Sequence, residues 1–201
     1  MKPAKNPNHP KKGSRITVDP IRRLKDVKAI SKLLSDNPRD LLLFTMGINN
    51  GLRVGDLLQL KMKDVANLKA GDRLTIRESK TNKDNVLVVN KAVHKALRKF
   101  FGQNRQDPED YLFGSNKVKG SPLKIESVNR LVKEWCRAIN LKSNYGAHTL
   151  RKTFGYIQRT VYGVGFEVLA KRFNHSSPAV TMRYLGIEDK EIHDILMNEI
   201  G

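Results

Sequence analysis

The stretch DRLTIRESKTNKDNVLVVN, residues 72–90, interrupts a pattern that is otherwise helical. Its two halves, DRLTIRES and DNVLVVN, carry β-branched residues that alternate or cluster, and the segment KTNK separates them. Short runs of this kind, bounded by turn residues, are typical of strands. The stretch therefore predicts two strands of a small antiparallel sheet, joined by a tight turn that carries Lys80 and Lys83.

Helical patterns lie on both sides of this stretch. Asp26 is expected to cap a helix, Pro38 begins a helix that is apolar nearly all round, and a short helix restarts after Gly51. Further helical patterns, bounded by Gly, Pro, Ser or Asn, cover residues 91–104, 125–140, 148–161, 166–173, 178–184 and 188–199. The sequence thus predicts an α+β fold that is mainly α-helical and has one small antiparallel β-sheet.

Composition limits the class of protein. The 201 residues are 39% apolar, enough for one core of moderate size. The sequence has no run of eighteen apolar residues and no apolar region of a signal peptide, so we expect no contact with a membrane. A single cysteine, Cys136, excludes an internal disulfide framework and a cysteine-based zinc cluster, and it favours a cytoplasmic setting.

Positive charge is the strongest bulk feature of the chain. Lysine and arginine number 38 against 20 acidic residues, which gives a net charge of +18 and an isoelectric point near 10.1. Such an excess favours nucleic acid as the partner, ahead of an anionic membrane, because no surface helix combines apolar and basic faces. On charge alone, basic ribosomal or chaperone-like roles stay open.

The two ends of the chain differ in charge, and this divides it into three segments. Residues 1–20 are rich in Pro, Asn and Lys, which predicts a flexible basic arm. Residues 188–201 are acidic, with an apolar stripe that predicts an amphipathic helix. The expected folded domain is residues 21–187. Candidate contacts with DNA are Lys11, Lys12 and Arg15 in the arm and Lys83 in the turn.

Two short motifs place arginines at helix starts. In GLRVGDLLQL, Asp56 lies three residues after Arg53, so the two share a helix face and Asp56 could orient the guanidinium. In HTLR, His148 and Arg151 project from the same side of one helical turn, an unfavourable pairing unless an anion lies between them. Taken alone, these motifs are better explained as a surface ion pair and a solvated basic face than as functional groups.

Two further candidates carry a lysine and a tyrosine. Lys80 lies at the hairpin tip, where a lysine usually serves solubility or protects a sheet edge. In FNHSSPAVTMRYL, Tyr184 follows His175 by nine residues, and a tyrosine there can simply be packed on a surface. The sequence contains no zinc-type spacing, Walker loop, dinucleotide glycine motif or carboxylate cluster.

The candidate side chains are those that phosphoryl transfer without a metal requires. Two fixed guanidinium groups can clamp the nonbridging oxygens of a phosphate and stabilise the charge of the transition state in place of magnesium. A tyrosine, whose ordinary pKa is near 10, becomes a nucleophile once a base removes its proton.

Taken in order, these blocks resemble the tyrosine recombinase family, the phage-type integrases and their chromosomal relatives. Each motif is weak by itself, but their order and spacing over residues 21–187 are specific. The residues that match are Arg53, Lys80, His148, Arg151, His175 and Tyr184.

The resemblance implies a role for each residue. Tyr184 would attack a scissile DNA phosphate and form a 3′-phosphotyrosyl link, releasing a 5′-hydroxyl. Arg53 and Arg151 would clamp the phosphate, and His175 would donate a further hydrogen bond. His148 would serve as acid and base near the tyrosine.

The remaining implications concern the leaving group, cofactors and assembly. Lys80 would protonate the leaving oxygen, and Asp56 would orient an arginine without taking part. The covalent link preserves the phosphodiester energy, so no metal, ATP or other cofactor is expected. The expected partner is double-stranded DNA, bound by a protein that is monomeric when free and homotetrameric on paired sites, and associated with the nucleoid.

The family usually places a helical DNA-clamping domain ahead of the catalytic one, and about 20 residues are too few for it. The basic arm or an accessory protein would then replace that domain. The resemblance also implies that the C-terminal helix can pass between protomers. Two other functions remain open: a non-catalytic DNA-binding accessory protein on the same fold, and a nick-and-close enzyme like type IB topoisomerases.

Overall fold

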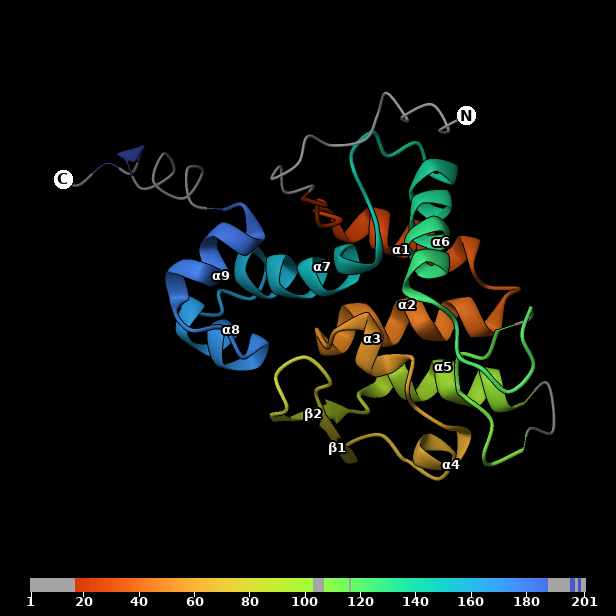
Figure 1. Cartoon of the computed structure of the whole chain (residues 1–201). Coiled ribbons are helices and arrows are strands. Elements are labelled where there is room, and N and C mark those ends of the chain that lie inside the picture. Colours follow the sequence, from red (N-terminus) through yellow and green to blue (C-terminus); the bar gives the residue numbers. More distant parts are fainter. Residues whose placement is uncertain (1–16, 103–106, 116, 188–195, 198, 200–201) are drawn as a thin grey trace, which may run out of the picture.

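The computed structural model describes residues 17–102, 107–115, 117–187, 196–197 and 199 (Figure 1). Most of the described elements are helices, and two short strands form one antiparallel sheet, so the predicted α+β fold is confirmed. In chain order the elements are α1 (Leu24–Leu33), α2 (Pro38–Asn50), α3 (Val54–Leu57), α4 (Met62–Val65), β1 (Arg73–Arg77), β2 (Asp84–Val88), α5 (Lys91–Phe101), α6 (Ile125–Ala138), α7 (Ala147–Thr160), α8 (Phe166–Phe173) and α9 (Pro178–Leu185).

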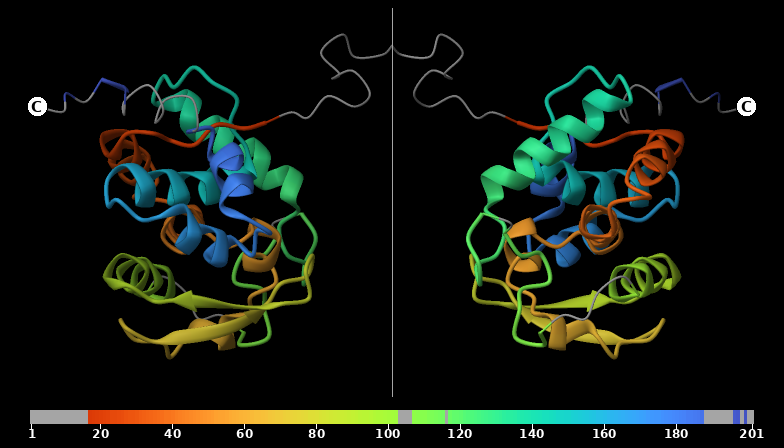
Figure 2. Two further views of the ribbon diagram at one scale, coloured as in Figure 1. Left: turned by 90° about the vertical axis from the view of Figure 1, so that its left-hand side faces the viewer. Right: turned by 90° about the vertical axis from the view of Figure 1, so that its right-hand side faces the viewer.

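The sheet forms one edge of the molecule, below α5 in both views of Figure 2. Strands β1 and β2 pair antiparallel, with Arg73 opposite Val88 and Arg77 opposite Asp84. In β1, Leu74 is half-buried and Ile76 is buried, because alternate residues of a strand point to the same face. The turn between the strands carries Lys80, which is exposed, as the sequence predicts.

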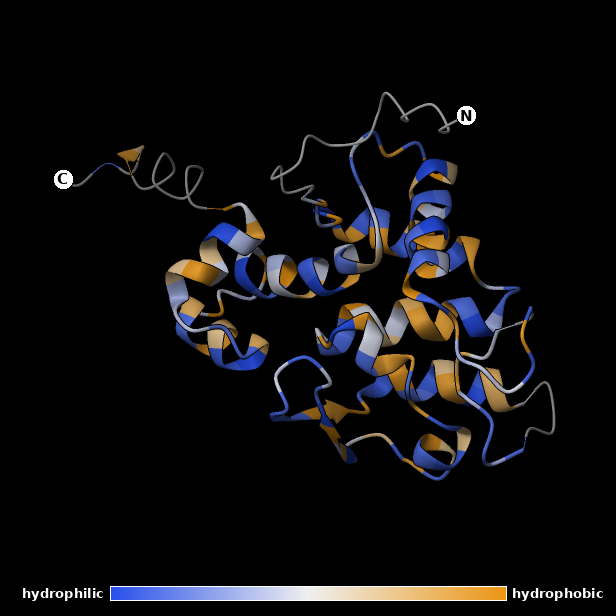
Figure 3. Cartoon of the chain, in the orientation of Figure 1, coloured by the Kyte–Doolittle hydropathy of each residue, from blue (hydrophilic) through white to orange (hydrophobic). Residues whose placement is uncertain are grey.

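Helix α2 is the centre of the main core and packs against both α5 and α7. Most of its residues are buried, as its sequence predicts, and its ribbon is partly orange in Figure 3. Close approach to α7 depends on Gly47, because a Cβ there would lie 2.8 Å from a carbon of Leu150. Gly51 ends the helix with φ of 59°, a conformation that glycine adopts without strain.

A second, smaller apolar cluster joins α7, α8 and α9. Helix α7 belongs to both clusters: Leu150 lies in the main core, and Tyr156 and Ile157 lie in the smaller one. At Gly155 a Cβ would lie 2.7 Å from the ring of Phe173, so this glycine allows α8 to approach. The part of α7 between Leu150 and Tyr156 therefore lies where the two clusters meet.

Several local predictions need correction. Asp26 does not cap α1, because Arg23 takes the N-cap position. Asp26 lies in the first turn, and its carboxylate accepts a 2.7 Å hydrogen bond from Nε of Arg23. An acidic residue there still interacts favourably with the helix N-terminus. The short helix α4 was not predicted. Within the part of the chain that the structure describes, no helix is both long and apolar enough to cross a membrane.

The predicted end segments lie largely outside the described residues. The structure describes only residues 17–20 of the predicted flexible arm, and these belong to the folded part. The backbone N–H of Asp19 donates to the carbonyl of Asn144 at 2.8 Å, and the Asn144 side chain donates to the carbonyl of Thr17. Lys11, Lys12, Arg15 and nearly all of the predicted helix 188–199 lie outside the described residues.

Candidate active site

Arg151 lies in α7 at the meeting point of the two apolar clusters and is only 2% exposed. Its guanidinium donates to the carbonyl of Gly51 at 2.7 Å and to that of Phe173 at 2.6 Å. The guanidinium carbon also lies 4.6 Å from the centre of the Phe173 ring. Burial lowers the pKa of Arg151 to about 10, so the side chain stays charged at neutral pH. Arg151 thus joins the end of α2 to the end of α8.

Arg53 occupies the position before α3 and is paired with a carboxylate that the sequence analysis did not select. Its Nη1 lies 2.5 Å from Oε2 of Glu78, which is fully buried. Glu78 also accepts hydrogen bonds from Thr81 Oγ1 at 2.6 Å and from Asn85 Nδ2 at 2.8 Å. The structure therefore holds one face of the Arg53 guanidinium against the β-hairpin.

Asp56 does not orient Arg53, contrary to the prediction. Its Oδ1 accepts from the backbone N–H of Ser79 at 3.0 Å and from the Ser79 hydroxyl at 2.8 Å. The physical reason is local: Arg53 has extended backbone angles at the N-cap, so the shared helix face assumed for residues three apart does not include it. Asp56 instead anchors the turn that carries Lys80.

His175 follows α8 directly, after Asn174 ends the helix in a left-handed conformation with φ of 52°. Its backbone N–H donates to the carbonyl of Ala170, and its Nδ1 lies 3.0 Å from Oγ1 of Thr181. Burial, with the positive charges of Arg151 and Arg53, lowers the pKa of His175 to about 4. The imidazole is therefore neutral at physiological pH and can donate one hydrogen bond.

Tyr184 lies in α9, and its ring packs against His175 and Phe173. Its ring is 5.1 Å from that of His175 and 5.7 Å from that of Phe173, centre to centre, and the ammonium of Lys152 lies 5.1 Å from its centre. The hydroxyl oxygen is buried. Burial raises the pKa of Tyr184 to about 12, against the opposing effect of the Arg151 and Arg53 charges. The phenol is protonated at neutral pH and needs a base.

His148 and Lys80 lie at the exposed rim of the site. His148 is in the first turn of α7, and Lys80 and Lys83 are in the hairpin turn. Partial burial and the charges of Arg151 and Lys80 lower the pKa of His148. The fold thus brings His148 and Lys80 close enough for their charges to interact, although 67 residues lie between them in the sequence.

Arg172 is a further, partly buried cation near the site, and the sequence patterns do not single it out. Its Nε donates to the carbonyl of Asn50 at 2.8 Å, its Nη2 binds the same carbonyl, and its Nη1 donates to Oδ1 of Asn85 at 2.7 Å. Burial lowers its pKa, and the charge of Glu78 opposes this. Arg172 attaches α8 to α2 and to β2. No sequence signal distinguishes it from its neighbour Lys171, which is exposed.

The histidine environment predicts that stability falls in mild acid. A pKa of about 4 in the folded protein, against about 6.5 unfolded, means that the unfolded state binds the extra proton between these values. Stability from His175 is therefore complete above pH 6.5 and is lost as pH falls toward 4. The free energy of unfolding is measured by urea denaturation at pH 7 and at pH 4.5. Its decrease between these pH values should be smaller by about 2 kcal/mol in His175→Gln than in the wild type. His94→Gln, on α5, is the control, and an equal effect there would contradict the prediction.

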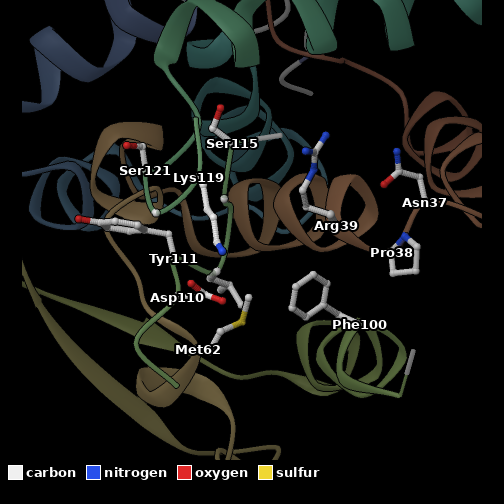
Figure 4. A pocket seen from close by; sticks show the side chains of 13 residues that line it. Asn37, Pro38, Arg39, Met62, Phe100, Asp110, Tyr111, Ser115, Lys119 and Ser121 are labelled. Atoms are coloured by element: carbon white, nitrogen blue, oxygen red, sulfur yellow. The ribbon is translucent and has the colours of Figure 1, made fainter. Parts of the chain in front are cut away.

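An open cavity of about 380 Å³ lies elsewhere, between the start of α2, the end of α5 and residues 110–115 and 119–121 (Figure 4). Its wall includes Arg39, Phe100, Tyr111 and Lys119. None of the six matched residues lines it, and Arg39 is paired with the adjacent Asp40. Among the described residues, no three His, Cys, Asp or Glu side chains form a group that could hold a metal ion.

Comparison with known proteins identifies relatives across most of the chain. The phage integrase family matches residues 15–191. The probable integrase/recombinase YoeC of Bacillus subtilis (strain 168) is 37% identical over 175 residues, which cover 86% of this chain and 91% of the relative. A tyrosine recombinase of Pseudothermotoga lettingae is 31% identical over 172 residues, 83% of this chain and 57% of the relative.

Solved structures share the fold at lower sequence identity. The crystal structure of XerA recombinase matches with a TM-score of 0.71 at 20% identity, over 93% of this chain and 68% of that one. The site-specific recombinase XerH, bound to a palindromic difH substrate, matches with a TM-score of 0.68 at 18% identity, over 90% and 53%. The chain therefore belongs to the phage integrase family and has the fold of a tyrosine recombinase catalytic domain.

Proposed function

We propose that this protein is a site-specific DNA recombinase that breaks and rejoins strands through a 3′-phosphotyrosyl intermediate. The observation that carries the proposal is the convergence of unlike groups from distant parts of the chain. The charges of Arg53 and Arg151 both act on His175 and on Tyr184, and the rings of His175 and Tyr184 are in contact. Such a cluster of cations around a tyrosine suits an anionic substrate.

The two arginines would bind the scissile phosphate. Arg53 keeps 18% of its side chain exposed beside a buried carboxylate, so part of the side chain is accessible to a ligand. The charged guanidinium of Arg151 is held in a fixed position by two carbonyl groups. Because this charge is fixed before DNA arrives, it stabilises the transition state without the cost of reorganisation. His175, neutral at physiological pH, would donate a further hydrogen bond to a phosphate oxygen.

Proton transfers would complete the first strand cut. The Tyr184 oxygen bonds to phosphorus while the bond from phosphorus to the 5′ oxygen breaks. The phenolic proton passes to His148, whose lowered pKa leaves it neutral and able to accept. Lys80, on the exposed turn, supplies a proton to the departing 5′ oxygen. Reversal with a new 5′-hydroxyl rejoins the strands, so atoms and charge balance over the cycle.

Double-stranded DNA is the proposed partner. Solved relatives include XerH bound to difH substrate and a lambda integrase dimer bound to a COC′ core site. The net charge of +18 suits the same partner. Tetramer formation on paired sites, exchange of residues 188–201 between protomers, an accessory protein and association with the nucleoid all remain proposals.

A suicide substrate tests the proposed chemistry. A nicked duplex traps the intermediate. The short piece between the scissile phosphate and the nick carries the released 5′-hydroxyl, and it diffuses away, so the strand cannot be rejoined. Incubation in EDTA without nucleotide should give a protein–DNA complex that survives SDS. Candidate DNA sites are found by selecting the genomic fragments that the protein binds most tightly and protects from nuclease digestion. An absolute requirement for magnesium in the first cut would reject this mechanism. Transfer to a second duplex would separate recombination from simple nicking and closing.

A further inference from the structure

Glu78 is the one fully buried carboxylate that contacts a matched arginine among the described residues. It lies immediately after β1 and continues the buried alternation of that strand, in which Ile76 also points inward. A buried charge is costly unless it is paired and hydrogen-bonded. Glu78 satisfies both conditions through Arg53, Thr81 and Asn85.

The carboxylate of Glu78 is ionised under all ordinary conditions. Burial alone raises its pKa, but hydrogen bonds from Thr81 and Asn85, together with Arg53, outweigh burial and lower the pKa to about 2. Two of these partners belong to the hairpin itself, so the carboxylate has a fixed position even without the arginine. Arg53 therefore docks onto a preformed acceptor.

The main chain of Glu78 also defines the turn that carries Lys80. Its N–H donates to the carbonyl of Lys83 at 2.9 Å, and its carbonyl accepts from the N–H of Asn82 at 2.9 Å. Asp56, in α3, holds the next residue, Ser79. Two consecutive residues therefore attach the turn to the helical part of the fold. Glu78 contacts Arg53, and Ser79 contacts Asp56 in α3.

We propose that Glu78 is a positioning residue that fixes the Arg53 guanidinium and holds it in register with the turn that presents Lys80. This inference rests on the proposed function, because it gives Arg53 a phosphate to bind. The Glu78 carboxylate holds one side of the guanidinium. Residues that contact a functional side chain in this way keep it in a productive orientation. Two cations from separate elements then approach one DNA strand together.

The first test compares Glu78→Gln with Glu109→Gln. Glu109 is a matched control because it also pairs with cations, Lys61 and Lys63, but on an exposed loop. Glu78→Gln should slow single-turnover cleavage by roughly 10- to 100-fold, as loss of a partner that orients a functional side chain typically does. DNA affinity should be unchanged or tighter, since a negative charge is removed. Glu109→Gln removes the same charge and should leave the cleavage rate unchanged.

A double-mutant cycle with Arg53→Ala identifies the route of the effect. If Glu78 acts through Arg53, then Glu78→Gln changes the residual rate little once Arg53 is absent. An undiminished effect in the Arg53→Ala background would overturn the proposal. A faster reaction in Glu78→Gln alone would also overturn it, because Glu78 would then be a competitor of the phosphate.

A measurement without DNA keeps the inference separate from the proposed function. In ¹⁵N NMR of the full chain, the Arg53 side-chain signals, assigned with Arg53→Lys, should show hindered rotation that Glu78→Gln abolishes. If Glu78→Gln does not fold, Glu78→Asp is used, because it keeps the charge but withdraws the carboxylate from the guanidinium. Unchanged Arg53 signals would overturn the positioning role. An inactive wild-type protein with the expected signals would reject only the proposed function.

Discussion

Replacement of Tyr184 by phenylalanine should abolish covalent capture of DNA while leaving the fold and DNA binding intact. The Tyr184 ring keeps its contacts with His175 and Phe173 when only the hydroxyl is lost. Removing a hydroxyl of this kind changes stability by about 1 kcal/mol or less. Without the oxygen nucleophile there is no bond to phosphorus, so the SDS-resistant complex should fall below detection.

Tyr156→Phe is the matched control for this experiment. Tyr156 lies in the same apolar cluster, and a cation, the Arg22 guanidinium, lies 4.9 Å from its ring centre, as Lys152 lies near that of Tyr184. This variant should trap DNA as the wild type does. Mass spectrometry of the trapped peptide should locate the nucleotide on Tyr184. Covalent capture by Tyr184→Phe would show that another residue is the nucleophile and would reject the assignment.

Arg151→Lys should reduce single-turnover cleavage by roughly 10²-fold or more, the usual cost of losing one preorganised donor to a transition state. Lysine keeps the charge, but one ammonium cannot replace the planar guanidinium that bridges the carbonyls of Gly51 and Phe173. One of these buried carbonyls then lacks a partner, which should also lower stability by about 1–3 kcal/mol. DNA affinity should change only a few-fold, because the net charge is the same.

Arg159→Lys supplies the comparison on the same helix. Its guanidinium carbon also lies 4.6 Å from a phenylalanine ring, that of Phe166, so both substitutions remove a stacked guanidinium from α7. Arg159→Lys should leave the cleavage rate within a few-fold of wild type. Cleavage and equilibrium unfolding are measured in parallel. If Arg151→Lys cleaves at the wild-type rate while its affinity collapses, Arg151 binds DNA without stabilising the transition state.

Local chemistry explains why most elements could be predicted from the sequence. Asn37 and Pro38 begin α2 where the sequence indicates, because the asparagine side chain accepts from the N–H of Asp40 and proline favours the first helical position. Ser177 and Pro178 begin α9 in the same way. A four-residue helix is too short to show a helical period. The equally short α3 is indicated by the break at Gly51, whereas no such signal precedes α4.

The sequence by itself determined the hairpin, the main helices and the order of the six matched residues, because caps, turns and hydrophobic periods act over a few positions. It did not determine that Glu78, rather than Asp56, contacts Arg53, or that Arg172 joins α8 to Asn50 and Asn85. These contacts join elements that are 25 to 122 residues apart. Only tertiary packing brings the start of α3 to the hairpin, and α8 to the end of α2 and to β2, within hydrogen-bonding distance. Burial and the charged or hydrogen-bonded partners together then shift the pKa values of these groups.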